Sequence, residues 1–356
     1  MYPIVLFQQS VYEAIRKYDA MRENHTDHNA KITRRHALQT IAQLPIQMYG
    51  LAFLLSDQQA LPPPKEFLPL CAAGITACLE LRQYEPEGWV TIRRILATYL
   101  PTLEKLAQQS SPMKQTAAHL AAQGHLLGHM LADHYGRLDQ MEAAARRARF
   151  YGQLANDPNL ETSALVRLAV RFDYEHQYPK ALEIYQEGLA LPGFSCVSPL
   201  LQGRIYSGLA GMYAACQQES PALSFLNLAK ETWPTEPQAD PSYTFAYSQW
   251  IDLGEGLTLE HTGHYAEAIN VYLRYMPGLQ EPNPQHLNKA AVAAVKQRDL
   301  EAAYRHSDIA EEVAWNTQHK QRLTEVHDTL RSMQLIWPHE PKVKTLQEKL
   351  YERQHI

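Results

Sequence analysis

The sequence predicts an all-α protein whose helices form a repeat, an α-solenoid that coils into a right-handed superhelix. Apolar residues recur three and four positions apart along most of the chain, which is the period of an α-helix. No stretch of any length alternates between apolar and polar residues as a strand does, and only 16 of the 356 residues are glycine. Small residues also return at shared offsets in successive helix pairs, and this recurrence indicates a repeat.

The composition is that of an ordinary folded protein, with 45% hydrophobic and 20% charged residues. A net charge of -5 gives no general attraction for nucleic acid or for an anionic membrane. The four cysteines form no CxxC motif and no disulfide framework, so free thiols in a reducing compartment are expected. We therefore expect a cytoplasmic protein that binds neither nucleic acid nor a membrane directly.

One segment resembles a twin-arginine export signal, because Arg34 and Arg35 precede a fairly apolar run that extends to Leu55. The pair begins about thirty residues into the chain, Gln43 and Pro45 interrupt the run, and no small-x-small cleavage site follows. The run is also too short and too interrupted to cross a bilayer. Export stays an alternative to the cytoplasmic prediction.

Two short regions are expected before the solenoid. Residues 1–30 are predicted to form a leader helix, because Val11, Ile15 and Tyr18 recur at helical spacing. This leader is too short to hold a separate DNA-binding domain. Residues 31–61 are predicted to contain short helices and a linker.

The solenoid is expected to span residues 62–356. It begins at three consecutive prolines from Pro62, which favour extended backbone and separate it from the leader. Two closing helices are expected, at about 323–337 and about 343–351, and the polar residues of the last one suit an end cap.

Three helices are expected before the clearest repeats. The first covers about residues 66–84, and the second begins near Val90 and is kinked or ended by Pro101. The third is long and ends near His134, with Pro112 in its first turn after a serine cap.

The repeats can be aligned on the small residue near the start of the second helix of each pair. These anchors lie about 35 to 46 residues apart, and another small residue lies twelve positions before each of them. The offsets reproduce the ladder of small and aromatic residues in the tetratricopeptide repeat, a helix-turn-helix unit of about 34 residues. Glycine and alanine let two helices approach closely where they cross, and larger residues fill the space on either side. A non-repetitive helical bundle is the alternative. The anchors are Ala181, Ala222, Ala268 and Ala303, with Ala144 in an earlier and more degenerate unit.

A family resemblance rests on the stretches 34–38 (Arg-Arg-His-Ala-Leu), 70–74 (Leu-Cys-Ala-Ala-Gly), 198–206 (Ser-Pro-Leu-Leu-Gln-Gly-Arg-Ile-Tyr) and 208–211 (Gly-Leu-Ala-Gly). They resemble the tetratricopeptide C-terminal half of bacterial helix-turn-helix regulators, particularly those of Ktedonobacter-type soil bacteria. The likeness covers about residues 32–350. In such regulators a DNA-binding domain precedes the repeats, and this chain departs from that pattern because residues 1–30 are too short for one. We therefore expect either a stand-alone relative of these regulators or a truncated or separately encoded sensor half.

A group of four histidines between His119 and His134 raises the question of a metal site. His125, His129 and Asp133 are spaced four residues apart on one helix face, and imidazoles with a carboxylate are ligands for zinc or iron. However, eight residues of straight helix span about 12 Å, so the three cannot all reach one ion. The H-E-x-x-H motif of metallohydrolases is also missing. We expect no metal and no cofactor, and a metal-dependent enzyme using this cluster stays a minor alternative.

A concave groove is the predicted binding site, because ligands of tetratricopeptide arrays usually lie on the concave face. In this groove arginine, lysine and asparagine side chains would hold the carboxylate or backbone of a peptide by charge-assisted hydrogen bonds. The alignment transfers the groove positions to His125, His129, Arg167, Asp173, Tyr174, Arg204, Asn288 and Lys289.

The expected function is a non-catalytic scaffold that binds a peptide or protein segment in signalling or transcriptional regulation. The phosphate-binding G-x-x-x-x-G-K-[ST] motif, the dinucleotide-binding G-x-G-x-x-G motif and the hydrolase G-x-S-x-G motif are all missing. The main alternative is the sensor half of a transcriptional regulator, which would respond to a peptide by changing the pitch of the superhelix. A homodimer is also compatible with the sequence.

Overall fold

The computed structural model describes residues 4, 7–8, 10–14, 35–44, 63–82, 86–233, 249–274 and 283–354. This part of the chain contains helices and the turns between them, and no strand, so the all-α prediction is confirmed. None of its helices is long and apolar enough to cross a membrane. The main helices are α4 (Pro64–Leu81), α5 (Glu87–Gln108), α6 (Lys114–His134), α7 (Leu138–Ala155), α8 (Pro158–Tyr174), α9 (Tyr178–Leu189), α10 (Pro199–Ala215), α11 (Glu219–Thr232), α12 (Gln249–His261), α13 (Tyr265–Leu273), α14 (Pro284–Gln297), α15 (Leu300–Asn316), α16 (Lys320–Ile336) and α17 (Pro341–Gln354).

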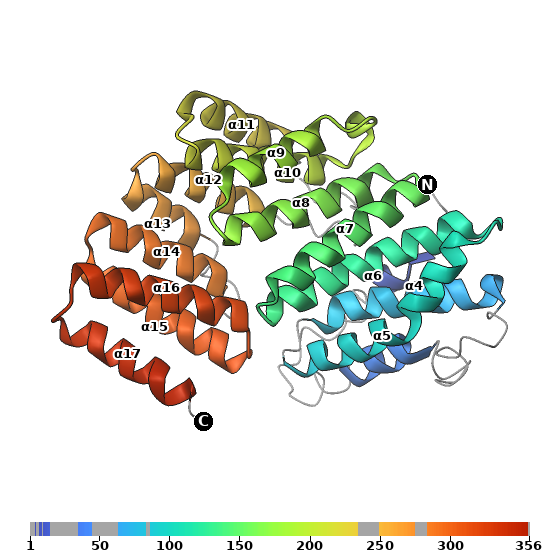
Figure 1. The fold of residues 1–356 in the computed structure, drawn as a ribbon, viewed down its shortest axis with the longest axis horizontal. Helices are drawn as coiled ribbons and strands as arrows, with labels where there is room; N and C mark the ends of the chain where they lie inside the picture. The colour runs from blue at the N-terminus through green and yellow to red at the C-terminus, as the bar shows by residue number, and fades with distance from the viewer. Residues whose placement is uncertain are drawn as a thin grey trace.

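The helices are stacked in chain order along an arc. Each helix packs against the next one, and even-numbered helices also contact one another, as α6 does α8, α8 does α10 and α10 does α12. Figure 1 shows the arc bending so that its two halves face each other, with α16 beside α6. The described helices therefore curve round far enough for elements almost two hundred residues apart to touch.

The same turn joins the two helices of a pair in five places. A residue with positive φ lies two positions before the second helix, as His176 does before α9. The N–H of His176 donates to the carbonyl of Asp173 at 2.9 Å, and the N–H of Gln177 donates to the carbonyl of Phe172 at 3.0 Å. This is the Schellman end of a helix, which satisfies carbonyls that the helix leaves free. Three of the five are not glycine, at a cost of about 1 kcal/mol each. The five residues are Gly136, His176, Gln217, Gly263 and Arg298.

The anchor alanines occupy equivalent places in this arrangement. Each lies three residues after the start of α9, α11, α13 or α15, and each is fully buried. In α7 the same position holds Met141, which is also fully buried, whereas the predicted anchor Ala144 is half-buried and lies one turn further on. A methionine in place of a small residue explains why this unit looks degenerate in sequence.

Two of the expected effects of proline do not occur: Pro101 does not end its helix, and part of the expected spacer belongs to a helix. Pro101 lies inside α5, which continues to Gln108. Pro63 and Pro64 cap and begin α4, a position where the missing N–H of proline costs nothing, so this part of the expected spacer starts a helix.

The described residues of the N-terminal segment pack on the first main helices. Ile4, Leu38 and Ala42 are buried in the same hydrophobic cluster as the apolar residues of α4, α5 and α6. The side chains of Gln8 and Gln123 exchange hydrogen bonds at 2.8 and 3.1 Å. Val11 of the predicted leader helix packs against the same cluster, whereas Ile15 and Tyr18, and Arg34 of the arginine pair, lie outside the described residues.

Candidate functional site

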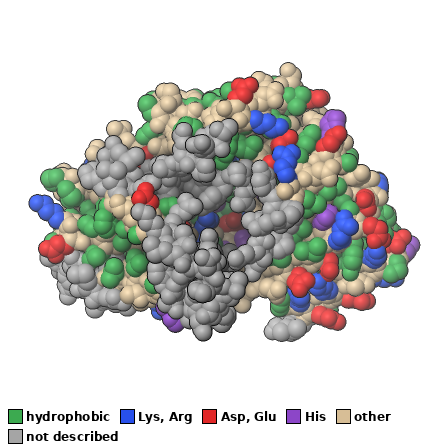
Figure 2. Space-filling model, turned by 180° about the vertical axis from the view of Figure 1, so that it is seen from behind, with side chains coloured by type: hydrophobic (Ala, Val, Ile, Leu, Met, Phe, Trp, Pro, Cys, Tyr) green, Lys and Arg blue, Asp and Glu red, His purple; other side chains and the backbone are tan. Residues whose placement is uncertain are grey.

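The even-numbered helices present polar and charged side chains to one another across the arc, and we call this surface the inner face. It contains six of the eight predicted binding residues. Figure 2, seen from behind, shows basic, acidic and histidine side chains at the bottom of a hollow. The inner face consists of Asp133 on α6, Arg167, Asp173 and Tyr174 on α8, Arg204 on α10, Trp250 and Glu260 on α12, Asn288 and Lys289 on α14, and Arg322 and Glu325 on α16.

Arg322 connects α16, in the C-terminal part of the arc, to α6 and α8. Its Nη2 donates to the Tyr174 hydroxyl at 2.6 Å and lies 3.3 Å from Oδ2 of Asp133, while Nη1 pairs with Glu325 on its own helix. Asn288 donates to the Arg322 carbonyl at 3.1 Å and to Glu325 at 3.0 Å. Burial raises the pKa of the Tyr174 phenol well above its usual value, so the hydroxyl is neutral and accepts the bond. These contacts close the array between α6, α8 and α16.

A second group of charges surrounds Lys289. Burial alone would lower the pKa of Lys289, but the carboxylates of Asp173, Glu260 and Glu325 outweigh it and the pKa is raised. The buried Glu260 accepts hydrogen bonds from Lys296 at 2.8 Å and from the Tyr272 hydroxyl at 2.9 Å. Burial acts to raise the pKa of Glu260 as well, yet the two lysines lower it. Lys289 and Glu260 are therefore both charged at neutral pH.

Two arginines dominate the third part of the inner face. Partial burial and the neighbouring guanidinium of Arg204 lower the pKa of Arg167 to about 10. The Arg204 guanidinium lies over the Trp250 ring, 4.5 Å from its centroid, in a cation–π contact. The hydroxyl of Ser207 fixes this part of α12 by donating to the Trp250 carbonyl at 2.7 Å.

No family model and no curated protein matches this chain.

The remaining two predicted residues, His125 and His129, do not present their side chains on the inner face. The His125 Nε2 is 2.7 Å from Oε1 of Glu104, and its ring stacks on Tyr151, so it faces α5 and α7. The His129 Nε2 is 3.0 Å from the Arg167 carbonyl oxygen, and burial lowers the pKa of this imidazole to about 3. His129 is therefore a neutral contact between α6 and α8 beneath the inner face.

The four histidines of α6 also have four different sets of neighbours. His119 Nδ1 lies 3.1 Å from Oδ2 of Asp157, and the ring of His134 lies between Trp89 and His319, with centroid distances of 5.2 and 4.9 Å. Within the described residues no three side chains of histidine, cysteine, aspartate or glutamate are grouped as metal ligands would be.

Arg322 and Glu325 were not among the predicted residues, although they complete the inner face. No sequence motif marks these two residues, but the turn before α16 in the structure is the one found within the helix pairs. Gln318 has positive φ, and its neighbour His319 donates to the Ala314 carbonyl at 2.8 Å, which is the turn found within the helix pairs. If α16 is treated as the first helix of a further unit, the alignment places Arg322 and Glu325 on the inner face. They lie two and five residues after the first residue of α16, Lys320.

Proposed function

We propose that this chain is a tetratricopeptide-like α-solenoid that binds a peptide or protein segment on its inner face and catalyses no reaction. The recurring turn and the buried anchors support the repeat, and the contacts between even-numbered helices support a concave surface. The observation that carries the proposal is the gathering of arginine, lysine, asparagine and aromatic side chains from five helices on that surface. Such groups bind peptide carboxylates, backbone and side chains together.

Removing two cations from the inner face is expected to weaken peptide binding at least about tenfold, because charge-assisted hydrogen bonds each contribute roughly 1.5–3 kcal/mol. The variant is Arg167→Gln with Lys289→Gln, both half-buried on the inner face. Binding is measured on the full chain with peptides that the unaltered protein selects from a random library.

The matched control removes two cations from the outer surface, with Arg146→Gln on α7 and Lys180→Gln on α9, which are both exposed. We expect it to bind like the unaltered protein. Circular dichroism and thermal melting establish that both variants are folded. Equal binding by the inner-face and outer-surface variants would remove the inner face as the binding site.

A second candidate function is favoured by the contact of Arg322 with α6 and α8. A ligand that enters between these helices has to compete with this closure, which is the behaviour of a sensor whose superhelix changes on binding. Small-angle scattering in the same titration separates the two: the sensor changes its radius of gyration at saturation, and the rigid scaffold does not. The sensor would serve signalling or transcriptional regulation through another chain or domain.

A further inference from the structure

Arg204 is a buried cation that lacks a carboxylate partner in the described part of the chain. The residue is only 7% exposed, and its guanidinium contacts the Trp250 ring and the Tyr185 hydroxyl. A guanidinium has five N–H donors, and these two neighbours leave most of them unused. By contrast, the equally buried Arg322 contacts two carboxylates. Since a buried charge is costly without a counter-charge, the surroundings of Arg204 favour an anion.

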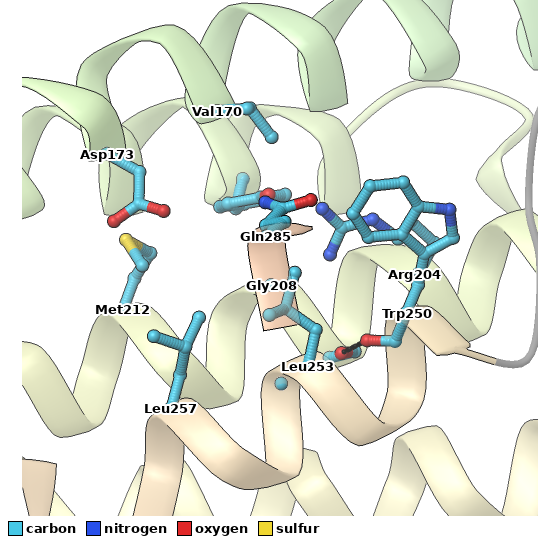
Figure 3. A pocket seen from close by; sticks show the side chains of 12 residues that line it. Val170, Asp173, Arg204, Gly208, Met212, Trp250, Leu253, Leu257 and Gln285 are labelled. Carbon is cyan, nitrogen blue, oxygen red and sulfur yellow. Dashed lines mark hydrogen bonds between the residues drawn. The ribbon is translucent and has the colours of Figure 1, made fainter. Parts of the chain in front are cut away.

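A pocket lies directly beside this guanidinium. Figure 3 shows Gln285 of α14 pointing toward Arg204, while Asp173 lies at the opposite end of the pocket next to Met212. Leu253 and Leu257 of α12 form an apolar part of the pocket lining. The space amounts to about 20 Å³, enough for about one water molecule or one small polar group.

The electrostatic environment at the Arg204 end is positive. Arg167 on the neighbouring helix is close enough for the two guanidinium groups to repel each other, which contributes to the lowered pKa of Arg167. The one carboxylate in the pocket, that of Asp173, acts on Lys289 and raises its pKa. An anion that enters at the Arg204 end therefore relieves a repulsion between cations, and the carboxylate that lines the pocket lies at its far end.

We propose that this pocket binds a carboxylate group of the peptide held on the inner face. This inference rests on the proposed function and adds the chemical class that the site selects. Arg204, fixed by its stacking on Trp250, pairs with the carboxylate through its planar fork, and the Gln285 amide donates a further hydrogen bond. The group is either the C-terminus of the peptide or an aspartate or glutamate side chain.

The test uses a synthetic library of random octapeptides in four forms, which end in a free carboxylate or an amide and either contain or lack acidic residues. Each form is incubated with the full-length protein, and the retained peptides are quantified by mass spectrometry. We expect retention of the forms that carry a carboxylate. Retention of the acid-free, free-ended form identifies the C-terminus as the source, and retention of the amidated acidic form identifies a side chain. The amidated acid-free form is expected to bind at least about tenfold more weakly.

Protein variants give a second readout. Arg204→Gln is expected to lose the preference for carboxylates, and Arg204→Lys is expected to keep part of it, because lysine retains the charge and lacks the fork. Arg146→Gln, which removes an exposed arginine of α7, is the control for the loss of one charge and should retain the full preference. The four peptide forms test the proposal on the unaltered chain, so a folding defect in Arg204→Gln does not affect the result.

Three outcomes overturn the inference. Equal retention of all four forms leaves peptide binding in place and rules out carboxylate selection. If folded Arg204→Gln keeps its full preference for carboxylates, another site must select them. Retention of no form by the unaltered protein contradicts both this inference and the proposed function.

Discussion

Replacement of Arg322 by alanine is expected to lower the free energy of unfolding by about 3 kcal/mol, measured by urea denaturation. Arg322 is buried, and its guanidinium joins Asp133 and Tyr174 to Glu325 across three helices. The substitution leaves two partly buried carboxylates without their cation, and it leaves the Tyr174 hydroxyl without a donor. The cost of stranding these groups is larger than the cost of losing one surface ion pair.

The matched control lies on the same helix. Arg331 pairs with Asp328 at 2.8 Å, but its side chain is 75% exposed, so Arg331→Ala is expected to change the free energy of unfolding by less than about 0.5 kcal/mol. If both variants lose the same small amount, the contact of α16 with α6 and α8 contributes nothing to stability. The array would then be open in solution.

The substitution Gly256→Ala is expected to lower the free energy of unfolding by about 3 kcal/mol or more. A Cβ at this position of α12 would lie 2.2 Å from Cε1 of Tyr272, whose ring is fully buried against the glycine backbone. The ring can move away only by leaving its packed position and losing its hydrogen bond to Glu260. Overpacking in a close-packed interior costs about 1–3 kcal/mol, and the lost bond adds to it.

A second glycine provides the contrast. At Gly128 in α6, the nearest atom to an added Cβ is 3.9 Å away, an ordinary contact, so Gly128→Ala is expected to be neutral or stabilising by up to about 1 kcal/mol. In the double variant with Tyr272→Leu, the ring is absent and the penalty of Gly256→Ala should shrink, which a double-mutant cycle measures. A stable Gly256→Ala chain with an unchanged melting temperature would contradict the close crossing of α12 and α13.

The helices could be predicted because their physical signals are local. Apolar spacing fixed the buried face of each helix, and the anchor alanines identified the places where helices cross. The end of α6 at His134 agrees with the prediction. Pro101 was less predictable, because a proline within a helix removes one backbone hydrogen bond, and the packing of a 22-residue helix outweighs this loss.

The composition of the inner face was harder to predict, since it depends on how far the stack of helices curves. The repeat alignment predicted that Arg167, Asp173, Arg204 and Lys289 share one surface, and they lie on α8, α10 and α14. It gave no information on the contact of Arg322 with Asp133, because residues 189 positions apart meet only after the whole arc has bent. It also could not show that His125 turns toward Glu104 on the preceding helix, since a helical position leaves the side-chain partner open.

Photo-cross-linking of a bound peptide tests the central claim, that the inner face is the binding surface, most directly. A photoreactive benzoylphenylalanine replaces either Trp250, on the inner face, or Phe150, which is 53% exposed on α7. Both exchanges put one aromatic side chain in place of another. A peptide selected by the unaltered protein is predicted to become attached at position 250 and to remain free with the reactive group at position 150. Attachment at position 150 alone would contradict the account.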